Sequence, residues 1–298
     1  MELLQILTTV AVSAAIYLLF ALGMSIVWGT MAILNFAHGS IFMFAAFVGY
    51  LVVKQVALPL VAVVLVAMLA GAILSVLMQL LAFEPIMKKA KNAHAAELQL
   101  VIGGIGLSAL PIFVAQRATL SNPFGYLKST FKVEYYDIGG WSISNLEIII
   151  LVVGWGLGIG TALFLRRSRQ GLALRSLGVD PEVSSLMGID RTRMALSGMA
   201  FAGALAGLAG ALTTFYLTSI TPESGNYILL KAFAAIILGG VGSVAGLMIG
   251  VTVLAGAETA VVLFSSGGWV NAVAFGLLFL ILVIRPQGVL GKKEVKRT

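Results

Sequence analysis

Cysteine is missing from this sequence, and histidine and charged residues are scarce. None of the 298 residues is Cys, two are His, and 10% are charged. A chain without cysteine forms no disulfide and has no thiolate nucleophile or metal ligand. His38 and His94 are too far apart in sequence to indicate a metal site, so we expect neither a metal nor another cofactor. A soluble domain carries roughly 25% charged residues, and this chain falls far below that value.

Nucleotide-binding and catalytic motifs are also absent. The sequence has no Gly-x-x-x-x-Gly-Lys-[Ser/Thr] loop, which would cradle the phosphates of ATP. The spacing Gly154-x-Gly156 lies inside an apolar run without a preceding strand, so it indicates close helix packing and not a nucleotide loop. No His–carboxylate cluster or Ser–His pair has a workable spacing, which argues against an enzyme. Any ATP hydrolysis coupled to this chain must therefore come from another chain.

Long hydrophobic runs dominate what is present. The chain is 60% hydrophobic, and its mean hydropathy is +1.05. The runs are about as long as a bilayer-spanning helix, roughly 20 residues, and they lack the alternation of barrel strands. The sequence therefore predicts an all-α, polytopic integral membrane protein. The runs cover residues 3–29, 36–53, 57–83, 98–115, 146–165, 195–217, 229–263 and 269–284.

Lysine and arginine are concentrated between these runs, in residues 84–97, 166–193 and 285–298. Short loops rich in these residues lie in the cytoplasm. The net charge of +7 therefore indicates a membrane topology and not nucleic-acid binding. Counting the runs places the N-terminus outside and the C-terminus in the cytoplasm. We expect one transmembrane domain over residues 1–298, with external loops at 117–145 and 218–227.

The run 229–263 requires a break. The cytoplasmic segments on either side demand an even number of crossings between residues 193 and 285, yet only three runs lie there. This run is too long for one span of about 20 residues. Gly239, Gly240 and Gly242 supply a natural helix break. We therefore expect eight spans plus one short or broken segment, which either crosses the membrane or re-enters it.

The segment Arg166–Arg193 contains six arginines and three acidic residues, so it must face water. Apolar positions between residues 172 and 179, with interruptions at Gly178 and Pro181, favour two short helices on the membrane surface. Two interpretations stay open. The segment is either an ordinary positively charged loop or a contact site for another protein.

A polar break, Asn35-Phe36-Ala37-His38-Gly39, separates the first two runs, and we expect it toward the cytoplasmic side. In one interpretation Asn35 accepts hydrogen bonds from the free N–H groups that open the next helix, and His38 is a satisfied buried histidine. In the other, the break is a gate in a translocation path, where a discontinuous helix exposes its backbone dipoles.

Lys231 and Glu258 are isolated charges in or beside apolar runs. Charges at such positions are costly and usually face a partner or a cavity. The topology places both toward the external side. They either form a structural ion pair, or are an unrelated glutamate and a snorkelling lysine, or flank a pathway for a zwitterionic solute.

Four segments together carry a family resemblance: residues 29–39, 175–190, 230–246 and 285–291. In these segments the chain resembles the permease subunits of branched-chain amino acid ABC importers, most closely the histidine-type permease of the pair that forms the channel. The resemblance covers nearly the whole chain. It implies a bacterial inner (plasma) membrane protein that pairs with a second related permease, while surrounded by membrane lipid.

The resemblance also implies two cytoplasmic ATPase subunits and an external, periplasmic binding protein that delivers leucine, isoleucine or valine. It implies a functional role for Asn35 and His38, and Gly39 is a further candidate residue of the translocation path or gate. Related permeases carry urea, short amides or other amino acids, so these substrates stay open, as does a stand-alone secondary transporter. The coupling contact with the ATPases would then lie within Gly171–Ile189, and its candidate residues are Gly171, Arg175, Asp180, Glu182, Met187 and Gly188.

Overall fold

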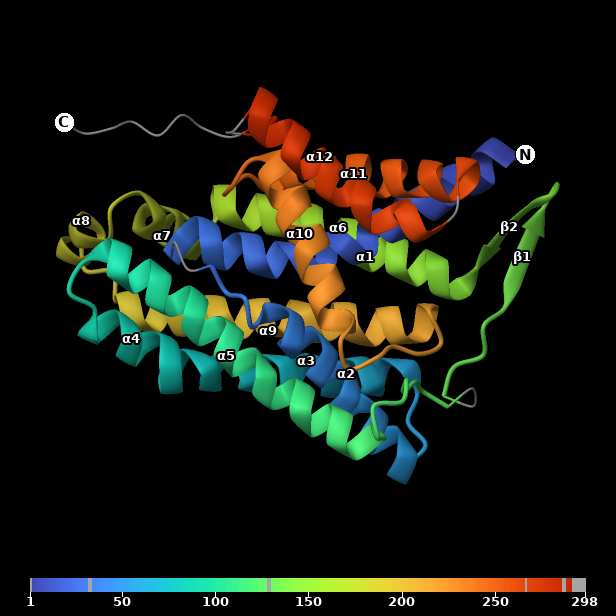
Figure 1. Ribbon diagram of the computed structural model, residues 1–298, viewed down its shortest axis with the longest axis horizontal. Coiled ribbons are helices and arrows are strands. Elements are labelled where there is room, and N and C mark those ends of the chain that lie inside the picture. Colours follow the sequence, from blue (N-terminus) through green and yellow to red (C-terminus); the bar gives the residue numbers. More distant parts are fainter. Residues whose placement is uncertain (1, 32–33, 128–129, 266, 286–287, 291–298) are drawn as a thin grey trace.

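The computed structural model describes residues 2–31, 34–127, 130–265, 267–285 and 288–290. Long helices lie side by side along the longest axis of the molecule, and α10 lies across them (Figure 1). The helices are α1 (Glu2–Met31), α2 (His38–Gln55), α3 (Leu60–Met78), α4 (Glu84–Lys89), α5 (Ala93–Thr119), α6 (Asn145–Arg167), α7 (Arg169–Val179), α8 (Pro181–Leu186), α9 (Arg191–Tyr216), α10 (Ser224–Gly239), α11 (Val244–Phe264) and α12 (Val270–Ile284), with a π-helical turn η1 (Gln79–Phe83) and a 3-10 turn η2 (Gly267–Trp269).

The hydrophobic runs form the helices that the sequence predicts, and the run 229–263 forms two. Six helical stretches among the described residues are long and apolar enough to cross a membrane. Helices α2 and α12, with 18 and 15 residues, are shorter than these six. The predicted all-α, polytopic membrane architecture is therefore confirmed. The six stretches are Glu2–Gly29, Leu60–Lys89, Ala95–Thr119, Asn145–Arg167, Arg191–Tyr216 and Val244–Phe264.

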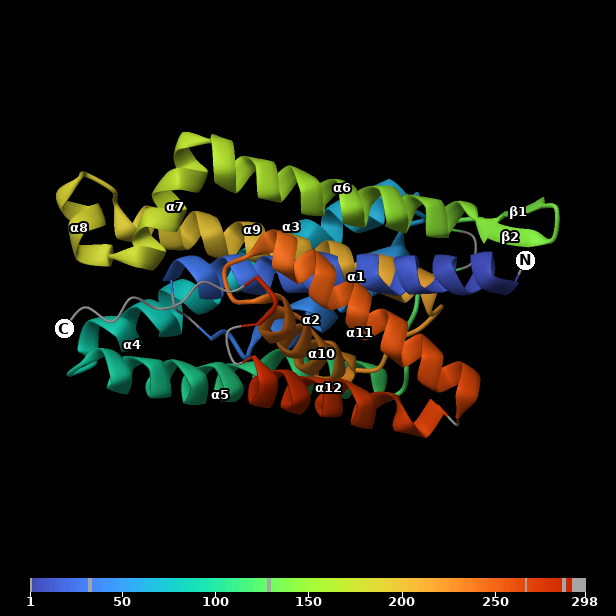
Figure 2. The ribbon, with the colours of Figure 1, turned by 90° about the horizontal axis from the view of Figure 1, so that it is seen from above.

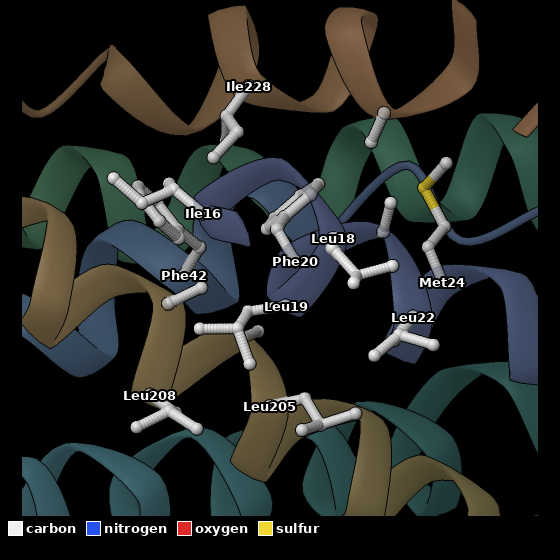
Figure 3. Packing of buried hydrophobic residues seen from close by; sticks show 14 of the residues in the cluster. Ile16, Leu18, Leu19, Phe20, Leu22, Met24, Phe42, Leu205, Leu208 and Ile228 are labelled. Atoms are coloured by element: carbon white, nitrogen blue, oxygen red, sulfur yellow. The ribbon is translucent and has the colours of Figure 1, made fainter. Parts of the chain in front are cut away.

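Helix α1 is the centre of the packing. The buried share of its most apolar window is 78%, and that of α9 is 72%, against 22–33% for α3, α5, α6 and α11. Leu19 and Leu22 of α1 lie beside Leu205 and Leu208 of α9, as Figure 3 shows. Helices α1 and α9 thus form the interior, and the other four long helices turn much of their surface outward.

Glycines bring several helices into backbone contact. A Cβ atom on Gly203 or Gly207 of α9 would collide with the backbone of α3, and one on Gly246 would collide with Gly239. Small residues spaced four apart allow this close approach in membrane helices. The spacing Gly203-x-x-x-Gly207 therefore serves the packing of α9 against α3.

Helix α10 ends at Gly239, and α11 begins at Val244. Between them Gly240 and Gly242 have φ values of +99° and +78°, which favour glycine. The Ser243 hydroxyl then accepts a hydrogen bond from the Gly246 amide (3.0 Å) and caps α11. Because α10 is steeply inclined to the long helices in Figure 1 and appears foreshortened in Figure 2, the chain changes direction at this turn.

Two predicted loops contain regular structure. In the expected loop 117–145, strands β1 (Tyr135–Ile138) and β2 (Trp141–Ser144) form an antiparallel hairpin around Gly139 and Gly140, both at positive φ. The Gly-Gly pair was the available signal for this hairpin. In the expected loop 84–97, residues 84–89 continue the preceding helix as α4, with an i,i+4 ion pair between Glu84 and Lys88 (2.7 Å).

The two expected external loops meet at the hairpin end of the bundle. Phe124 and Ile220 exchange backbone hydrogen bonds of 2.9 Å in both directions. The Tyr126 hydroxyl donates to the Ala46 carbonyl (3.2 Å), and burial raises the pKa of this phenol, which therefore stays protonated. These contacts fix the loop segments against α2 and the end of α9.

Candidate functional site

A cavity of about 300 Å³ lies among α1, α2, α9 and α10, beside residues 217–224. Its lining is mixed: hydroxyl side chains alternate with apolar ones, and Lys231 is the one charged side chain among the described residues that line it. Figure 3 shows the apolar liners Ile16, Phe42 and Ile228 close to one another. The full lining is Ser13, Ile16, Tyr17, Phe42, Thr213, Tyr216, Leu217, Ile220, Ser224, Tyr227, Ile228 and Lys231.

Lys231 belongs to a compact polar cluster with Tyr17 and Glu258. Its Nζ lies 2.9 Å from Glu258 Oε2 and 2.9 Å from the Tyr17 hydroxyl oxygen. The Tyr17 hydroxyl in turn donates to Glu258 Oε2 (2.6 Å). Nζ also lies 5.1 Å from the centroid of the Tyr17 ring. Each member thus contacts the other two, and the ion pair lies within the protein: the side chains of Lys231 and Glu258 are 17% and 8% exposed.

One donor of Lys231 and one carboxylate oxygen of Glu258 have no hydrogen-bond partner within the cluster. An ammonium group has three donors, and the contacts to Tyr17 and Glu258 occupy two of those of Lys231. Glu258 Oε1 is buried and has no hydrogen-bond partner among the described residues. Lys231 and Tyr17 line the cavity, whereas Glu258 stands behind them, outside its lining. The free donor of Lys231 is therefore available to a solute in the cavity.

The sequence predicts Lys231 and Glu258 as site residues but not Tyr17. Of the three interpretations of the two charges, the geometry supports contact between them, which leaves both a structural pair and a pathway element possible. Tyr17 gives no signal in the sequence, since one tyrosine within an apolar helix is ordinary. The run that the sequence places at 229–263 would put Lys231 at the start of its helix, but α10 begins two turns before Lys231, at Ser224.

The segment Asn35–Gly39 lies deep in the bundle. His38 Nε2 donates to the carbonyl of Phe20 (3.2 Å), and the two rings are 4.8 Å apart. Phe20 precedes the end of α1 at Met31 by roughly 16 Å of helix rise. The segment therefore lies within the bundle and not at the end of α1, and its position toward the cytoplasmic side stays a prediction. Hydropathy concealed this depth because the non-helical residues 34–37 include apolar side chains that extend the run.

Asn35 shapes the turn before α2. Its Oδ1 accepts a hydrogen bond from the Ala37 amide (3.0 Å), one residue before the helix, so it supports the entry without capping the first helical turn. Asn35 Nδ2 and His38 Nδ1 are buried and lack a partner among the described residues. One interpretation of the sequence predicts a buried His38 with its hydrogen bonds made, and the described part of the structure shows such a bond at Nε2 but none at Nδ1.

This segment adjoins the cavity. The Phe20 ring lies against both His38 and the cavity residue Phe42, with centroids 4.8 and 5.5 Å apart. Gly39 meets Gly225 at the start of α10, and a Cβ on either glycine would collide with the backbone of the other. His38 and Gly39 therefore support the walls of the cavity without lining it.

Helices α7 and α8 form a separate feature at the other end of the bundle from the hairpin (Figure 1). Asp180 caps α8: its Oδ1 accepts from the amides of Glu182 (3.1 Å) and Val183 (3.0 Å). A Cβ on Gly171 would collide with the backbone of Phe164 and Leu165, so glycine lets α7 fold back onto α6. Gly188, at φ +84°, ends the turn after α8.

These two helices expose apolar side chains. The exposed fractions are 81% for Val179, 87% for Leu186 and 79% for Met187. The opposite face of α7 is buried through Gly171, Leu174 and Leu177, and it packs on α1 and α6. Arg175 and Glu182 are exposed on this unit. An exposed apolar patch with a charged rim is typical of a protein contact site.

Comparisons with known proteins agree over almost the whole chain. The family model described as "Branched-chain amino acid transport system / permease component" matches residues 6–283. The chain is 31% identical over 289 residues to the high-affinity branched-chain amino acid transport system permease protein BraD of Pseudomonas aeruginosa, covering 94% of this chain and 93% of that protein.

Two further relatives also match over more than nine tenths of both chains. The chain is 28% identical over 295 residues to the permease protein LivH of Escherichia coli, with 94% of this chain and 93% of LivH covered. It is 29% identical over 302 residues to the probable branched-chain amino acid transport permease protein LivH of Methanocaldococcus jannaschii, with 98% and 95% covered. No solved structure gives a significant match. The extent of these matches, together with the membrane helices, shows that the chain belongs to the family of branched-chain amino acid transport system permease components.

Proposed function

We propose that this permease is one transmembrane subunit of an ATP-driven importer for leucine, isoleucine and valine. In this proposal it pairs with a second, related permease in the bacterial inner membrane. Two cytoplasmic ATPase subunits supply the energy, and a periplasmic binding protein delivers the amino acid. The relatives BraD and LivH are named as branched-chain amino acid permeases, which supports the substrate class.

The observation that carries the proposal is the α7–α8 unit, which offers Val179, Leu186 and Met187 to a partner outside the bundle. Exposing such side chains to water is unfavourable by roughly 25 cal/mol per Å² of apolar surface, so a partner that covers them gains this energy. Neighbouring arginines favour a cytoplasmic location for the unit. In this proposal the unit inserts into a cleft of an ATPase subunit, which supplies the ATP-binding loop that this chain lacks.

A direct route leads from this unit to the cavity. The buried face of α7 packs on α1, and α1 carries both Tyr17 and Phe20. A movement of the ATPases would therefore displace α1 as a rigid element and change access to the cavity by rocking of packed helices. In this scheme the cavity is a section of the translocation path. Lys231 and Glu258 form the charged pair at this section. Asn35, His38 and Gly39 support the wall of the cavity.

Orientation follows from the same scheme. The N-terminus and the β1–β2 hairpin face the periplasm, while α4, α7, α8 and the C-terminus face the cytoplasm. The binding protein docks on the surface made by residues 117–145 and 218–227, where Tyr135 and Ile138 are 71% and 63% exposed. Helix α10 enters from the periplasmic side and turns back at Gly239–Ser243.

The test is reconstitution of the complete importer in liposomes, with uptake of radiolabelled leucine as the measurement. We expect uptake that needs ATP, the ATPases and the binding protein together. Uptake by this chain alone down a leucine gradient would contradict the proposal and favour a secondary transporter. Uptake of urea or a short amide in place of leucine would retain the importer and replace its substrate.

A further inference from the structure

We infer that Lys231 forms a carboxylate-binding subsite whose strength is set by Glu258 and Tyr17. The subsite takes a solute that carries one carboxylate beside a branched apolar group. This inference deepens the proposed function and rests on it for the identity of the cavity as the path. No part of it requires the ion pair to open.

The first step is the position of the charge. Lys231 contributes a donor to the cavity, while the carboxylate of its partner Glu258 lies outside the lining. The cavity side of the pair is therefore electropositive, although the pair as a whole is neutral. A solute carboxylate at this point gains a charge-assisted hydrogen bond, which is roughly twice as strong as one between neutral groups.

The second step is the shape and chemistry around that donor. Ile16, Phe42 and Ile228 offer an apolar wall, and Ser13, Tyr216 and Ser224 offer hydroxyl groups. A ligand with a carboxylate and a compact branched side chain satisfies both kinds of lining at once. Its volume suits a cavity of about 300 Å³, which is at the small end of ligand pockets.

The third step is the strength of binding. A path must bind its solute well enough to admit it and weakly enough to release it. Glu258 Oε2, 2.9 Å from Nζ, repels an incoming carboxylate and already takes part of the attraction of the ammonium. The Tyr17 hydroxyl donates to the same oxygen (2.6 Å) and so holds Glu258 in this position. Glu258 and Tyr17 are positioning residues in this subsite, and Lys231 is the contact residue.

The test measures ligand-induced thermal stabilisation of the purified importer complex, without the binding protein. L-Leucine and 3-methylbutanoate carry the carboxylate, and leucinol lacks it. A ligand that binds the folded state raises the melting temperature according to its concentration and Kd. We expect both carboxylates to raise it, with a Kd of the order of millimolar, and leucinol to leave it unchanged.

Substitutions of Lys231 and of Glu258 should change the affinity for carboxylates in opposite directions. Lys231→Met should weaken carboxylate binding roughly tenfold or more, because a hydrogen bond to a charged group is lost. Glu258→Gln should strengthen it severalfold and slow the turnover of uptake, since the competing negative charge is gone. Tyr17→Phe should change binding in the same direction as Glu258→Gln, by less. Lys231→Arg should restore part of the binding that Lys231→Met loses.

The controls separate binding from folding. Lys54→Met removes another lysine beside an aromatic ring, with Nζ 5.9 Å from the Tyr50 ring, and should leave binding unchanged. If Lys231→Met leaves the glutamate buried alone and the protein unfolds, the double variant Lys231→Met/Glu258→Gln removes both charges and should fold without binding.

Carboxylate stabilisation that persists in Lys231→Met or in the double variant would overturn the inference, as would no stabilisation of the wild-type complex. A response to 3-methylbutanoate that depends on Lys231, in a complex that imports no leucine, would support the subsite and refute the proposed function. The two can therefore fail separately.

Discussion

Two glycines on different helices show how single residues shape this site. Gly39 in α2 and Gly225 in α10 approach so closely that neither has room for a Cβ atom. They bring the start of α2 against the start of α10, and thereby hold Phe42 and Ser224 at one cavity. Because Gly39 and Gly225 have no side chain, α2 and α10 can approach closely enough to form this wall of the cavity.

We predict that Gly39→Ala destabilises the protein by about 1–3 kcal/mol, the usual cost of overpacking a close contact. The measurement is the thermal melting temperature in detergent. Gly106→Ala is the matched control, because a Cβ on this glycine of α5 meets nothing within 4 Å. That control should be neutral or stabilising, since alanine favours a helix. Equal losses from both changes would refute the packing argument.

Asp180 combines two properties that one substitution can separate. It is a cap for α8 and a charge in the α7–α8 unit. Replacing an N-cap by alanine costs about 1 kcal/mol, whereas serine retains the cap without the charge. We predict that Asp180→Ala weakens co-purification with the ATPases and that Asp180→Ser retains most of it. If both fail equally, the charge contacts the ATPase directly.

At the scale of elements, α7 and α8 act as a unit because one face is buried and the other exposed. Leu174 and Leu177 fix α7 to α1 and α6, while Leu186 and Met187 stand free of the bundle. A partner that moves the exposed face can therefore displace α1 through the unit, because the buried contacts of α7 with α1 and α6 stay in place.

We predict that Leu186→Asp and Met187→Asp abolish ATP-driven uptake and ATPase binding while leaving membrane insertion and melting temperature unchanged. A charge on the exposed apolar face makes it costly to bury at an interface. Arg175→Glu should weaken the same contact by reversing a rim charge. The matched control is Leu174→Asp, which should instead reduce stability, since Leu174 is buried. Normal ATPase binding by both exposed-face variants would contradict the coupling role.

At the scale of the whole molecule, the hairpin and the α7–α8 unit lie at opposite ends of one helical bundle (Figure 1 and Figure 2). The cavity lies between α1, α2, α9 and α10, within the bundle. Two partners, one at each end of the bundle, can therefore act on the same central helix α1.

The cysteine-free sequence allows a clean test of orientation. We predict that Asp137→Cys, in the exposed hairpin, reacts with a membrane-impermeant maleimide in intact spheroplasts. Ser185→Cys, exposed on α8, should react only after the membrane is permeabilised. The measurement is the labelled fraction of each variant by mass shift. Reversed labelling would invert the topology and place α7 and α8 outside.

The sequence alone determined the membrane class, the helices and the break after Gly239. These follow from local chemistry: an apolar run as long as a bilayer forms a helix there, and glycines at positive φ end it. The family also followed from ordered motifs along the chain. The alternation within residues 135–144 was too short to predict the hairpin, although Gly139 and Gly140 marked its turn.

Only the tertiary structure decided which distant groups meet. Tyr17 joins Lys231 and Glu258 across 214 and 241 residues of sequence, and no local pattern encodes that contact. The depth of His38 beside Phe20 was hidden for the same reason, since hydropathy records whether a residue tolerates lipid and not where an irregular segment leads. The cavity is a product of these long-range contacts, because four helices have to pack before a lysine in one of them can line it.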